Sequence, residues 1–317
     1  IATDREVLSV PVDSYDRDDF ESAGSPEITD LVRNLTAVSG VVNTSEQFIE
    51  GGTITGIKNV NIRGLGLGRT LVLINGKRMV ETAVDTNAGE SPVDIGNFPS
   101  IALKRIELLK NGGSTVYGSD AVAGVFNMIT RTDFEGFEMN LSTTNINNSD
   151  PGYNFGFIYG NQNGANRFTI SYEYEEIGRL MNIDLGLVDW SSPAKWPLGF
   201  SSFGMPGTWH GDYVNKGAGQ GVDSIMDPTC GMTRPVAASK TGGLSHSVPL
   251  DGSNGFSKCG YNFVPFSNAI DPTTRNKVYV TVESDINDTT ELYFEYLHAG
   301  LDTTYTGSPS YPPTAAG

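Results

Sequence analysis

In the stretch NVNIRGLGLGRTLVLING, residues 59–76, every second residue from Gly64 to Gly68 is a glycine. Glycines at this spacing could cradle a phosphate group, because a phosphate-binding loop turns its backbone amides toward the anion. That chemistry requires a helix directly after the glycines and, for a dinucleotide, a third glycine at a set distance. Here Arg69 is followed by an apolar, β-branched run and then by the turn pair Asn75-Gly76. The pattern predicts a second strand and argues against a nucleotide-binding site.

Other chemistry-bearing residues do not form a catalytic or metal-binding pattern. Carboxylates are plentiful, but none is paired in the sequence with a base, a nucleophile or a metal-binding group. The three histidines, His210, His246 and His298, are scattered and do not cluster with the cysteines. We therefore expect a protein that is not an enzyme and that has no cofactor and no metal site.

Two cysteines, Cys230 and Cys259, lie 29 positions apart in a stretch rich in glycine, serine and proline. They could be two free thiols in a core. A disulfide is the preferred prediction, because free thiols in such a stretch would be exposed and reactive. A disulfide in turn predicts an oxidising compartment.

The composition of the chain argues against some classes of function. The chain has 317 residues and a net charge of -16, so it lacks the basic surface that nucleic acid requires. No run of 18 apolar residues predicts a transmembrane helix. Membrane-spanning strands stay possible, because their alternating pattern leaves no hydropathy peak.

The first part of the chain, residues 1–134, has the pattern of a small α/β unit. Apolar residues recur at helical spacing from Ile28 to Leu35. Short apolar runs then predict strands at 59–63, 70–74, 104–110 and 124–131.

From residue 135 the apolar period changes to two, which is typical of strands. Five segments alternate in this way, each with one apolar, aromatic-rich face and one polar face. They cover residues 137–141, 153–159, 168–174, 278–282 and 292–296.

The connections between these strands favour a membrane barrel over a soluble sandwich. Tight turns, NQNGAN and DINDTT, join the second strand to the third and the fourth to the fifth. A loop of nearly 100 residues, at about 177–274, separates the third strand from the fourth. Short turns on one rim and a long loop on the other are the asymmetry of outer-membrane barrels. Since the smallest such barrels need eight strands, we expect this sequence to be the front part of a longer protein.

Three stretches carry a resemblance to a known family: DLVRNLTAVSGV at 30–41, NIRGLGLGRTLVLINGKR, and KRIELLKNGGSTVYGSDAVAGVFNMITR. In that order they resemble the plug domain of TonB-dependent outer-membrane receptors. The resemblance implies an α+β plug domain at residues 1–134 inside a transmembrane antiparallel β-barrel. Residues 135–317 would be the N-terminal part of that barrel, with about five of about 22 strands. One departure is Lys110-Asn111-Gly112-Gly113, where most members have Arg-Gly-Pro.

The resemblance also implies a function. It places the protein in the outer membrane of a Gram-negative bacterium, as a plug-gated transporter that imports a scarce or bulky nutrient. That nutrient could be a glycan, a peptide or a metal chelate. The implied partners are outer-membrane lipid, a surface lipoprotein and the inner-membrane TonB energy complex, whose docking motif is expected upstream of Ile1. The alternative is a surface receptor or interaction protein of the outer membrane without transport.

A plugged barrel also implies polar contacts between plug and wall. Buried guanidinium and carboxylate groups must find partners, so we predict a plug–barrel lock. Its members would be Arg63, Glu107, Glu173, Glu175 and Glu295. Arg63 could instead be a solvated charge at the end of a strand. The glycines of the opening stretch, Gly66 and Gly68, would let the plug backbone pass closely under the barrel wall.

Candidate ligand contacts lie in polar plug segments and in the long loop. The plug candidates are Gln47, Glu81, Asp85 and Asn87; the loop candidates are the three tryptophans, Trp190, Trp196 and Trp209. Flat aromatic faces suit sugar rings, which favours an organic nutrient such as a glycan. Alternatively, the tryptophans form a small core of the loop, and the plug residues are simply solvated.

Overall fold

A computed structural model provides the structure of the chain. The described residues are 12–22, 28–39, 56–83, 89, 91–110, 113–186, 200–201, 208–211, 223–236, 239–251 and 257–306. The chain divides into two compact units, which are described separately. The first holds residues up to 144 together with 151–177 and 272–303, and the second holds 145–150, 178–271 and the C-terminal segment.

A five-stranded plug sheet forms the centre of the first unit, with the order β1-β4-β5-β2-β3. Its strands are β1 (Val12–Asp16), β2 (Thr70–Ile74), β3 (Lys77–Arg78), β4 (Leu103–Leu109) and β5 (Gly124–Thr130). Only β2 and β5 pair in parallel, and the other neighbours are antiparallel. Strands β2 and β5 are almost wholly buried apolar runs, as expected for strands covered on both faces.

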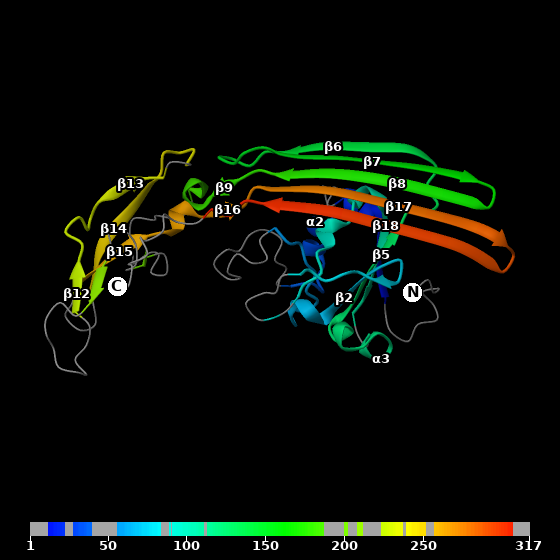
Figure 1. Ribbon diagram of the computed structural model, residues 1–317, viewed down its shortest axis with the longest axis horizontal. Helices are drawn as coiled ribbons and strands as arrows, with labels where there is room; N and C mark the ends of the chain where they lie inside the picture. The colour runs from blue at the N-terminus through cyan, green and yellow to red at the C-terminus, as the bar shows by residue number, and fades with distance from the viewer. Residues whose placement is uncertain are drawn as a thin grey trace. The chain divides into compact units, whose positions relative to one another are not determined.

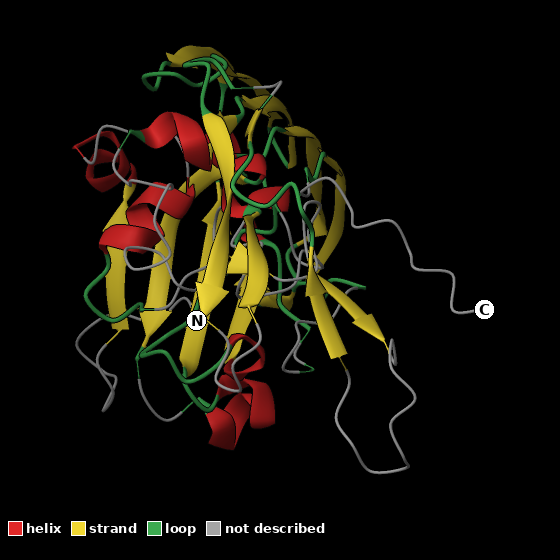
Figure 2. Ribbon diagram, turned by 90° about the vertical axis from the view of Figure 1, so that its left-hand side faces the viewer, coloured by secondary structure: helices red, strands yellow, loops and turns green. Residues whose placement is uncertain are grey.

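Short helices surround the plug sheet (Figures 1 and 2). They are α1 (Arg17–Ser22), α2 (Ile28–Asn34) and α3 (Ser114–Tyr117), with 3₁₀ turns η1 (Leu67–Arg69), η2 (Ile95–Asn97), η3 (Ser100–Ala102) and η4 (Ser119–Ala121). Helix α2 buries Ile28, Leu31 and Val32 in the main apolar core, together with residues of β4 and β5. Among the described residues, no helix is long and apolar enough to cross a membrane.

A second five-stranded sheet, the wall sheet, belongs to the same unit and lies across the plug (Figure 1). It has the order β18-β17-β8-β7-β6 and is antiparallel throughout. Its strands are β6 (Gly136–Thr144), β7 (Gly152–Asn163), β8 (Asn166–Ile177), β17 (Thr273–Asn287) and β18 (Thr290–Thr303). All five sequence-predicted strands are present, and the two predicted tight turns join β7 to β8 and β17 to β18.

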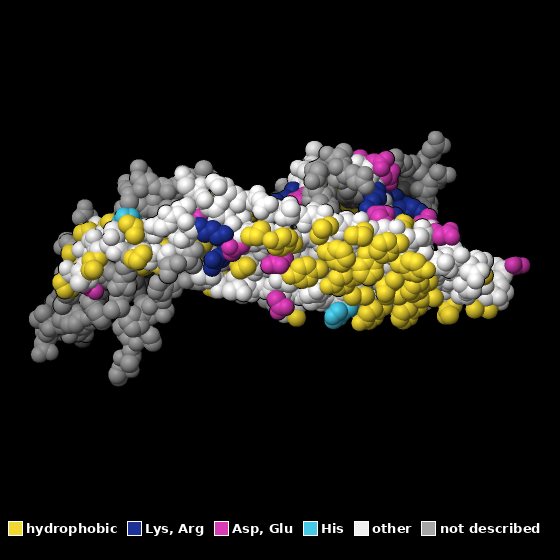
Figure 3. All heavy atoms as spheres, turned by 90° about the horizontal axis from the view of Figure 1, so that it is seen from above, with side chains coloured by type: hydrophobic (Ala, Val, Ile, Leu, Met, Phe, Trp, Pro, Cys, Tyr) yellow, Lys and Arg dark blue, Asp and Glu magenta, His cyan; other side chains and the backbone are white. Residues whose placement is uncertain are grey.

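The wall sheet has two different faces because successive side chains of a strand point to opposite sides. One face carries an exposed apolar band that includes Phe137, Met139, Leu141 and Phe294. Figure 3 shows this band as a continuous hydrophobic surface over the strands. The other face turns polar and charged residues toward the plug, where Glu173 and Arg275 are fully buried.

One expectation for the opening glycine stretch, the strand at 59–63, is wrong. Residues 59–61 form no strand, and Ile62 makes only an isolated bridge to Val38. The backbone turns directly afterwards, with left-handed φ at Arg63 and Gly64, so a ladder cannot continue. Gly66 also has positive φ, and Gly68 is exposed. The packing of Gly66 and Gly68 under the barrel wall stays a prediction.

Small sheets and one disulfide make up the second unit. A four-stranded sheet has the order β10 (Phe200–Ser201), β15 (Ser257–Asn262), β14 (Leu244–Asp251) and β13 (Thr233–Pro235). Two further sheets have two strands each. One pairs β11 (Thr208–Gly211) with β12 (Asp223–Met226), and the other pairs β9 (Leu180–Met181) with β16 (Asn268–Ile270). The 3₁₀ turns η5 (Asn182–Leu185) and η7 (Val264–Phe266) complete it. The predicted disulfide between Cys230 and Cys259 is present, with the Cα atoms 5.8 Å apart.

Candidate functional site at the plug–wall contact

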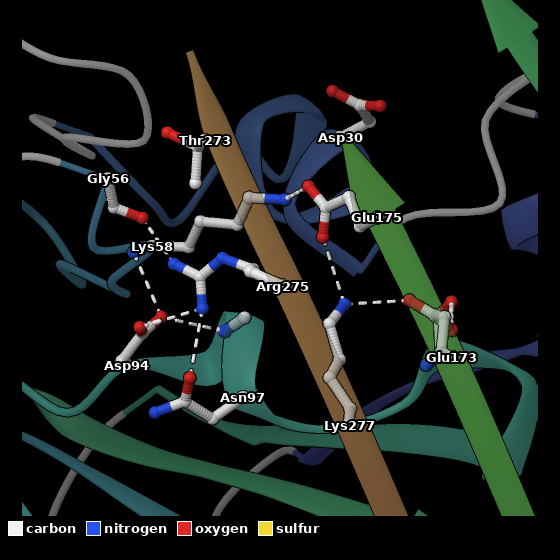
Figure 4. A network of polar contacts seen from close by, with 12 residues as sticks. Asp30, Gly56, Lys58, Asp94, Asn97, Glu173, Glu175, Thr273, Arg275 and Lys277 are labelled. Carbon is white, nitrogen blue, oxygen red and sulfur yellow. Dashed lines mark hydrogen bonds and ion pairs between the residues drawn. The ribbon is translucent and has the colours of Figure 1, made fainter. Parts of the chain in front are cut away.

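Three basic and three acidic side chains form a buried network between plug and wall (Figure 4). We call it the ion-pair network; its members are Lys58, Asp94, Glu173, Glu175, Arg275 and Lys277. Lys277 on β17 donates to Glu173 Oε1 at 2.7 Å and to Glu175 Oε2 at 2.9 Å, both on β8. One wall cation thus bridges two wall carboxylates.

The plug binds the same two carboxylates. Lys58, in the plug segment before Ile62, donates its ammonium to Glu175 Oε1. The Ser100 backbone N–H and hydroxyl donate to Glu173 Oε2 at 2.7 and 2.6 Å. Each glutamate therefore has one oxygen bonded to a wall cation and the other bonded to a plug residue. Together Glu173 and Glu175 connect the plug to the wall.

Arg275 forms the second half of the network. Its Nη1 donates to Asp94 Oδ2 and to Asn97 Oδ1, each at 2.9 Å, and its Nη2 donates to the Gly56 carbonyl. The other oxygen of Asp94 accepts the backbone N–H groups of Lys58 at 3.0 Å and Gly96 at 2.9 Å. Asp94 thereby fixes two plug segments to each other and to a wall arginine.

Burial decides the energetics of these contacts. The ion-paired side chains are 0–4% exposed, and three positive charges face three negative ones. Taking charges out of water is costly, and their mutual attraction offsets that cost only while each charge keeps its partners. Such a network contributes little net stability when intact, but loss of one member leaves an uncompensated buried charge. It therefore favours one discrete closed arrangement.

Strand register brings these residues together. Arg275 lies opposite Glu175, and Lys277 lies opposite Glu173, across the β17–β8 pair. Opposite charges on directly paired positions of one face attract each other. On the plug side, Gly96 lets the backbone of η2 approach Arg275: a Cβ there would stand 2.9 Å from Arg275 Cζ. Gly96 is thus a position where the plug backbone approaches the wall closely.

A second contact, the tyrosine cluster, joins the β2–β3 turn to β17 and β18. Its members are Asn75, Lys77, Tyr279, Tyr293 and Glu295. Glu295 accepts the Tyr279 hydroxyl, the Tyr293 hydroxyl at 2.7 Å and the Lys77 ammonium at 3.1 Å. Asn75 donates to Tyr279 Oη at 3.1 Å, and Lys77 stacks 3.5 Å above the Tyr293 ring centroid. The Lys77 side chain is 56% exposed, so this contact is far better solvated than the ion-pair network.

A third contact centres on Glu138 of β6. Arg17 and Arg131 donate to its two carboxylate oxygens at 2.6 and 2.8 Å. Both guanidinium groups also donate to the Ile101 carbonyl, at 3.4 and 3.2 Å. The start of α1 and the segment after β5 are thus fastened to the first wall strand.

Only some of the residues predicted for the plug–barrel lock lie at the contact between plug and wall. Glu173, Glu175 and Glu295 face the plug and bond to it. Arg63 is exposed in a turn, so the expectation of a buried guanidinium is wrong. The turn arises from the left-handed φ of 59° at this position. Glu107 is buried, and its Oε1 accepts from Arg105 at 2.8 Å within the plug sheet.

The predicted ligand contacts are mostly beyond what the structure describes. Glu81 is an exposed plug residue. Trp209 lies in β11, where its backbone pairs with Ile225. Five others fall outside the described residues: Gln47, Asp85, Asn87, Trp190 and Trp196. Their role in ligand binding stays a prediction.

Sequence reasoning missed the basic half of the network, namely Lys58, Arg275 and Lys277, and also Asp94. A signal for the wall cations was present in TRNKV at 274–278, because Arg275 and Lys277 alternate in phase with the inward positions of β17. Extending the predicted strand toward its N-terminus would have found them. No comparable signal marks Lys58 or Asp94, which lie in irregular segments.

Comparison with known proteins agrees with this architecture. The family model described as TonB-dependent Receptor Plug Domain matches residues 4–125. An iron-regulated outer membrane virulence protein from two strains of Vibrio cholerae serotype O1 is 35% identical over 131 residues, which is 41% of this chain and 18% of that protein. The chain therefore spans less than a fifth of the length of these relatives.

Two solved structures share the fold. One is a doubly substituted ferric enterobactin receptor from Pseudomonas aeruginosa, with a TM-score of 0.56 at 16% identity, covering 96% of this chain and 35% of that one. The other is a singly substituted form of that receptor in complex with enterobactin, with a TM-score of 0.54 at 15% identity, covering 93% and 34%. Taken with the plug-domain match, these findings show that residues 4–125 are the plug domain of a TonB-dependent receptor, and that the wall sheet has the fold of the first barrel strands of such outer-membrane receptors.

Proposed function

We propose that the full-length protein imports a bulky nutrient across the outer membrane through a barrel whose passage the plug closes. The observation that carries this proposal is the ion-pair network. It fastens the plug to the wall with polar contacts that can be broken and formed again, beside the apolar contacts that Tyr279 and Leu297 make with the plug core. A gate needs two discrete states that differ by a modest free energy. Polar contacts that are either formed or broken give the plug two such states.

A metal chelate is the substrate class that we favour. The Vibrio cholerae relative is named for its regulation by iron, and the Pseudomonas aeruginosa structures are receptors for ferric enterobactin. These names outweigh the tryptophan argument for a glycan, because two of the three tryptophans fall outside the described residues. Glycans and peptides stay in the test as competing substrates.

The TonB energy complex is the partner that such a gate requires. Binding of ligand alone would have to overcome the buried ion pairs, whereas a pull on the N-terminal side of the plug supplies work from outside the site. Outer-membrane lipid would cover the apolar band of the wall sheet. A surface lipoprotein stays a prediction from the resemblance.

Uptake by the full-length protein in its own outer membrane tests the proposal. Cells would receive radioactive iron as several ferric chelates, and labelled glycans and peptides in parallel, with and without a protonophore. Uptake of a ferric chelate that stops when the inner-membrane gradient collapses is the expected result. Gradient-sensitive uptake of a glycan or peptide alone would overturn the substrate class.

The competing function is a surface receptor without transport, which the disulfide-bonded second unit would suit. Tight ligand binding to whole cells with no gradient-sensitive uptake would favour it. A Lys277→Met variant provides an internal check on the gate, because a weakened lock should leak a large hydrophilic antibiotic. Lys104→Met is the matched control, since Lys104 pairs with Asp133 in an exposed position of the plug.

A further inference from the structure

The charges of the ion-pair network are divided evenly between wall and plug (Figure 4). The wall holds Arg275, Lys277, Glu173 and Glu175, and the plug holds Lys58 and Asp94. Each of these two sets is electrically neutral by itself. In the closed arrangement, however, ions pair across the contact, because Arg275 binds Asp94 and Lys58 binds Glu175. Plug and wall can therefore separate without net charge on either side, provided that these ions change partners.

Arg275 has a second carboxylate within reach on the wall itself. Glu175 lies directly opposite it across the β17–β8 pair, and directly opposed residues have Cβ atoms about 4.5–5.5 Å apart. In the closed arrangement both Nη atoms of Arg275 donate to the plug. Its Nε is buried and, among the described residues, has no hydrogen-bond partner. A rotation of the side chain toward Glu175 would give this Nε an acceptor and allow a bidentate pair.

The two plug ions are also close to each other. Asp94 Oδ1 accepts the backbone N–H of Lys58 at 3.0 Å. The Lys58 side chain passes the turn that Asp94 caps, since its Cδ is 2.8 Å from where a Cβ of Gly96 would stand. The Lys58 ammonium can therefore reach the Asp94 carboxylate once Arg275 has released it.

We propose that the ion-pair network opens by re-pairing of its ions. As the plug leaves the wall, Arg275 turns from Asp94 to Glu175, and the Lys58 ammonium takes its place at Asp94. The other wall pair stays as it is. Every charge then has an opposite charge in both states, so opening avoids the cost of an uncompensated charge. The wall cations are also paired within the wall, so they do not hold an anionic chelate in the passage. This inference rests on the proposed gate and states how that gate opens.

The first test is the structure of the full-length Asp94→Asn variant. Asparagine keeps the size of the side chain but removes the charge that Arg275 binds. The expected result is an Arg275 side chain turned to Glu175, with a guanidinium nitrogen within about 3.2 Å of a carboxylate oxygen. An Arg275 without contact to Glu175, whether it keeps its hydrogen bonds to Asn97 and the Gly56 carbonyl or binds another group, would overturn the proposal.

A second test asks whether Asp94 and Glu175 can replace each other. Re-pairing means that either carboxylate can serve Arg275 and Lys58 when the other is lost. The single variants Asp94→Asn and Glu175→Gln should then be mild, whereas the double variant leaves both cations without either carboxylate. Fixed partners predict a different result, because each single variant then strands one cation and the double variant strands both, so that the two effects simply multiply.

Hydrogen exchange in the purified full-length protein separates these two results. The Ser100 and Ile101 amides donate to Glu173, which all three variants keep. Their exchange in the double variant should exceed the product of the two single effects by about tenfold or more. Asp120→Asn removes the partner of the exposed Arg78, and its effect should simply multiply with that of either single variant. The assay involves no transport, so its failure is distinguishable from a failure of the uptake test. A double variant that only matches the product would overturn the re-pairing.

Discussion

The ion-pair network and the tyrosine cluster both fasten the plug to the wall sheet, but they differ in how far their charges are exposed to water. The network uses formal charges that are almost fully buried. The cluster places a carboxylate that is 15% exposed among two phenols, an amide and a lysine that is 56% exposed. Contacts of the first kind are discrete and fail abruptly when a member is lost. Contacts of the second kind can be weakened gradually, since water can replace the exposed Lys77 at Glu295.

The largest effect is expected from Lys277→Met in the full-length protein. Among the described residues, the variant leaves Glu175 paired with Lys58 and leaves Glu173 with only the neutral donors of Ser100 and Ile101. Removing one member of a buried ion pair typically costs about 3–5 kcal/mol. The loss should appear as faster hydrogen exchange of the Ser100 and Ile101 amides, whose acceptor is Glu173.

A double variant separates the charge effect from simple loss of packing. Adding Glu173→Gln to Lys277→Met removes the one charge that the loss of Lys277 leaves uncompensated, so it should restore part of the lost protection. A double variant that is less protected than Lys277→Met alone would show that the network does not act through charge balance.

A smaller effect is expected from Gly96→Ala, which leaves every charge in place. The added methyl group would stand 2.8 Å from Lys58 Cδ and 2.9 Å from Arg275 Cζ. Arg275 is held at both Nη atoms, so it cannot move aside freely. Overpacking of this kind costs about 1–3 kcal/mol. Thermal unfolding of the full-length variant should show it, and Gly300→Ala, which meets nothing within 4 Å, should leave the transition unchanged.

A buried carboxylate in the second unit, Asp184, is stabilised by neutral hydrogen-bond donors instead of by cations. Asp184 is 2% exposed and accepts hydrogen bonds from Ser239 Oγ at 2.6 Å, from the Lys240 N–H at 3.0 Å and from Thr241 Oγ1 at 2.8 Å. Burial alone would raise the pKa of Asp184, but these hydrogen bonds favour the charged form and hold the pKa below its usual value.

The lowered pKa of Asp184 predicts a pH dependence of its turn. A depressed folded pKa stabilises the turn at pH values above the unfolded pKa of about 3.9, and the stabilisation is lost as the pH falls through the lower folded value. Hydrogen exchange of residues 239–243, corrected for its intrinsic pH dependence, should therefore rise only in acid. Asp184→Asn should show the raised exchange already at neutral pH. Equal exchange in the variant and the parent would refute this role.

The sequence predicted the regular elements better than the contacts. Strands of the wall alternate strictly, so their faces could be assigned from the period of two, and Glu173, Glu175 and Glu295 were placed toward the plug. The plug partners could not be found this way. Lys58 and Asp94 lie in irregular segments, where position depends on tertiary contacts rather than on a period. Arg63 was misplaced for the same reason: left-handed backbone at Arg63 and Gly64 places Arg63 in an exposed turn instead of at a strand end.

The smallest effect is expected from Lys77→Met, which makes the same chemical change as Lys277→Met in the better solvated contact. Lys77 pairs with Glu295 at 3.1 Å, but the two tyrosine hydroxyls still donate to that carboxylate after the substitution. Exposed ion pairs contribute about 0–1 kcal/mol, so thermal unfolding should shift little. The added methionine can also keep part of the contact with the Tyr293 ring. A loss as large as that of Lys277→Met would remove the distinction between the two contacts, because it would show that solvent does not replace the lysine at Glu295.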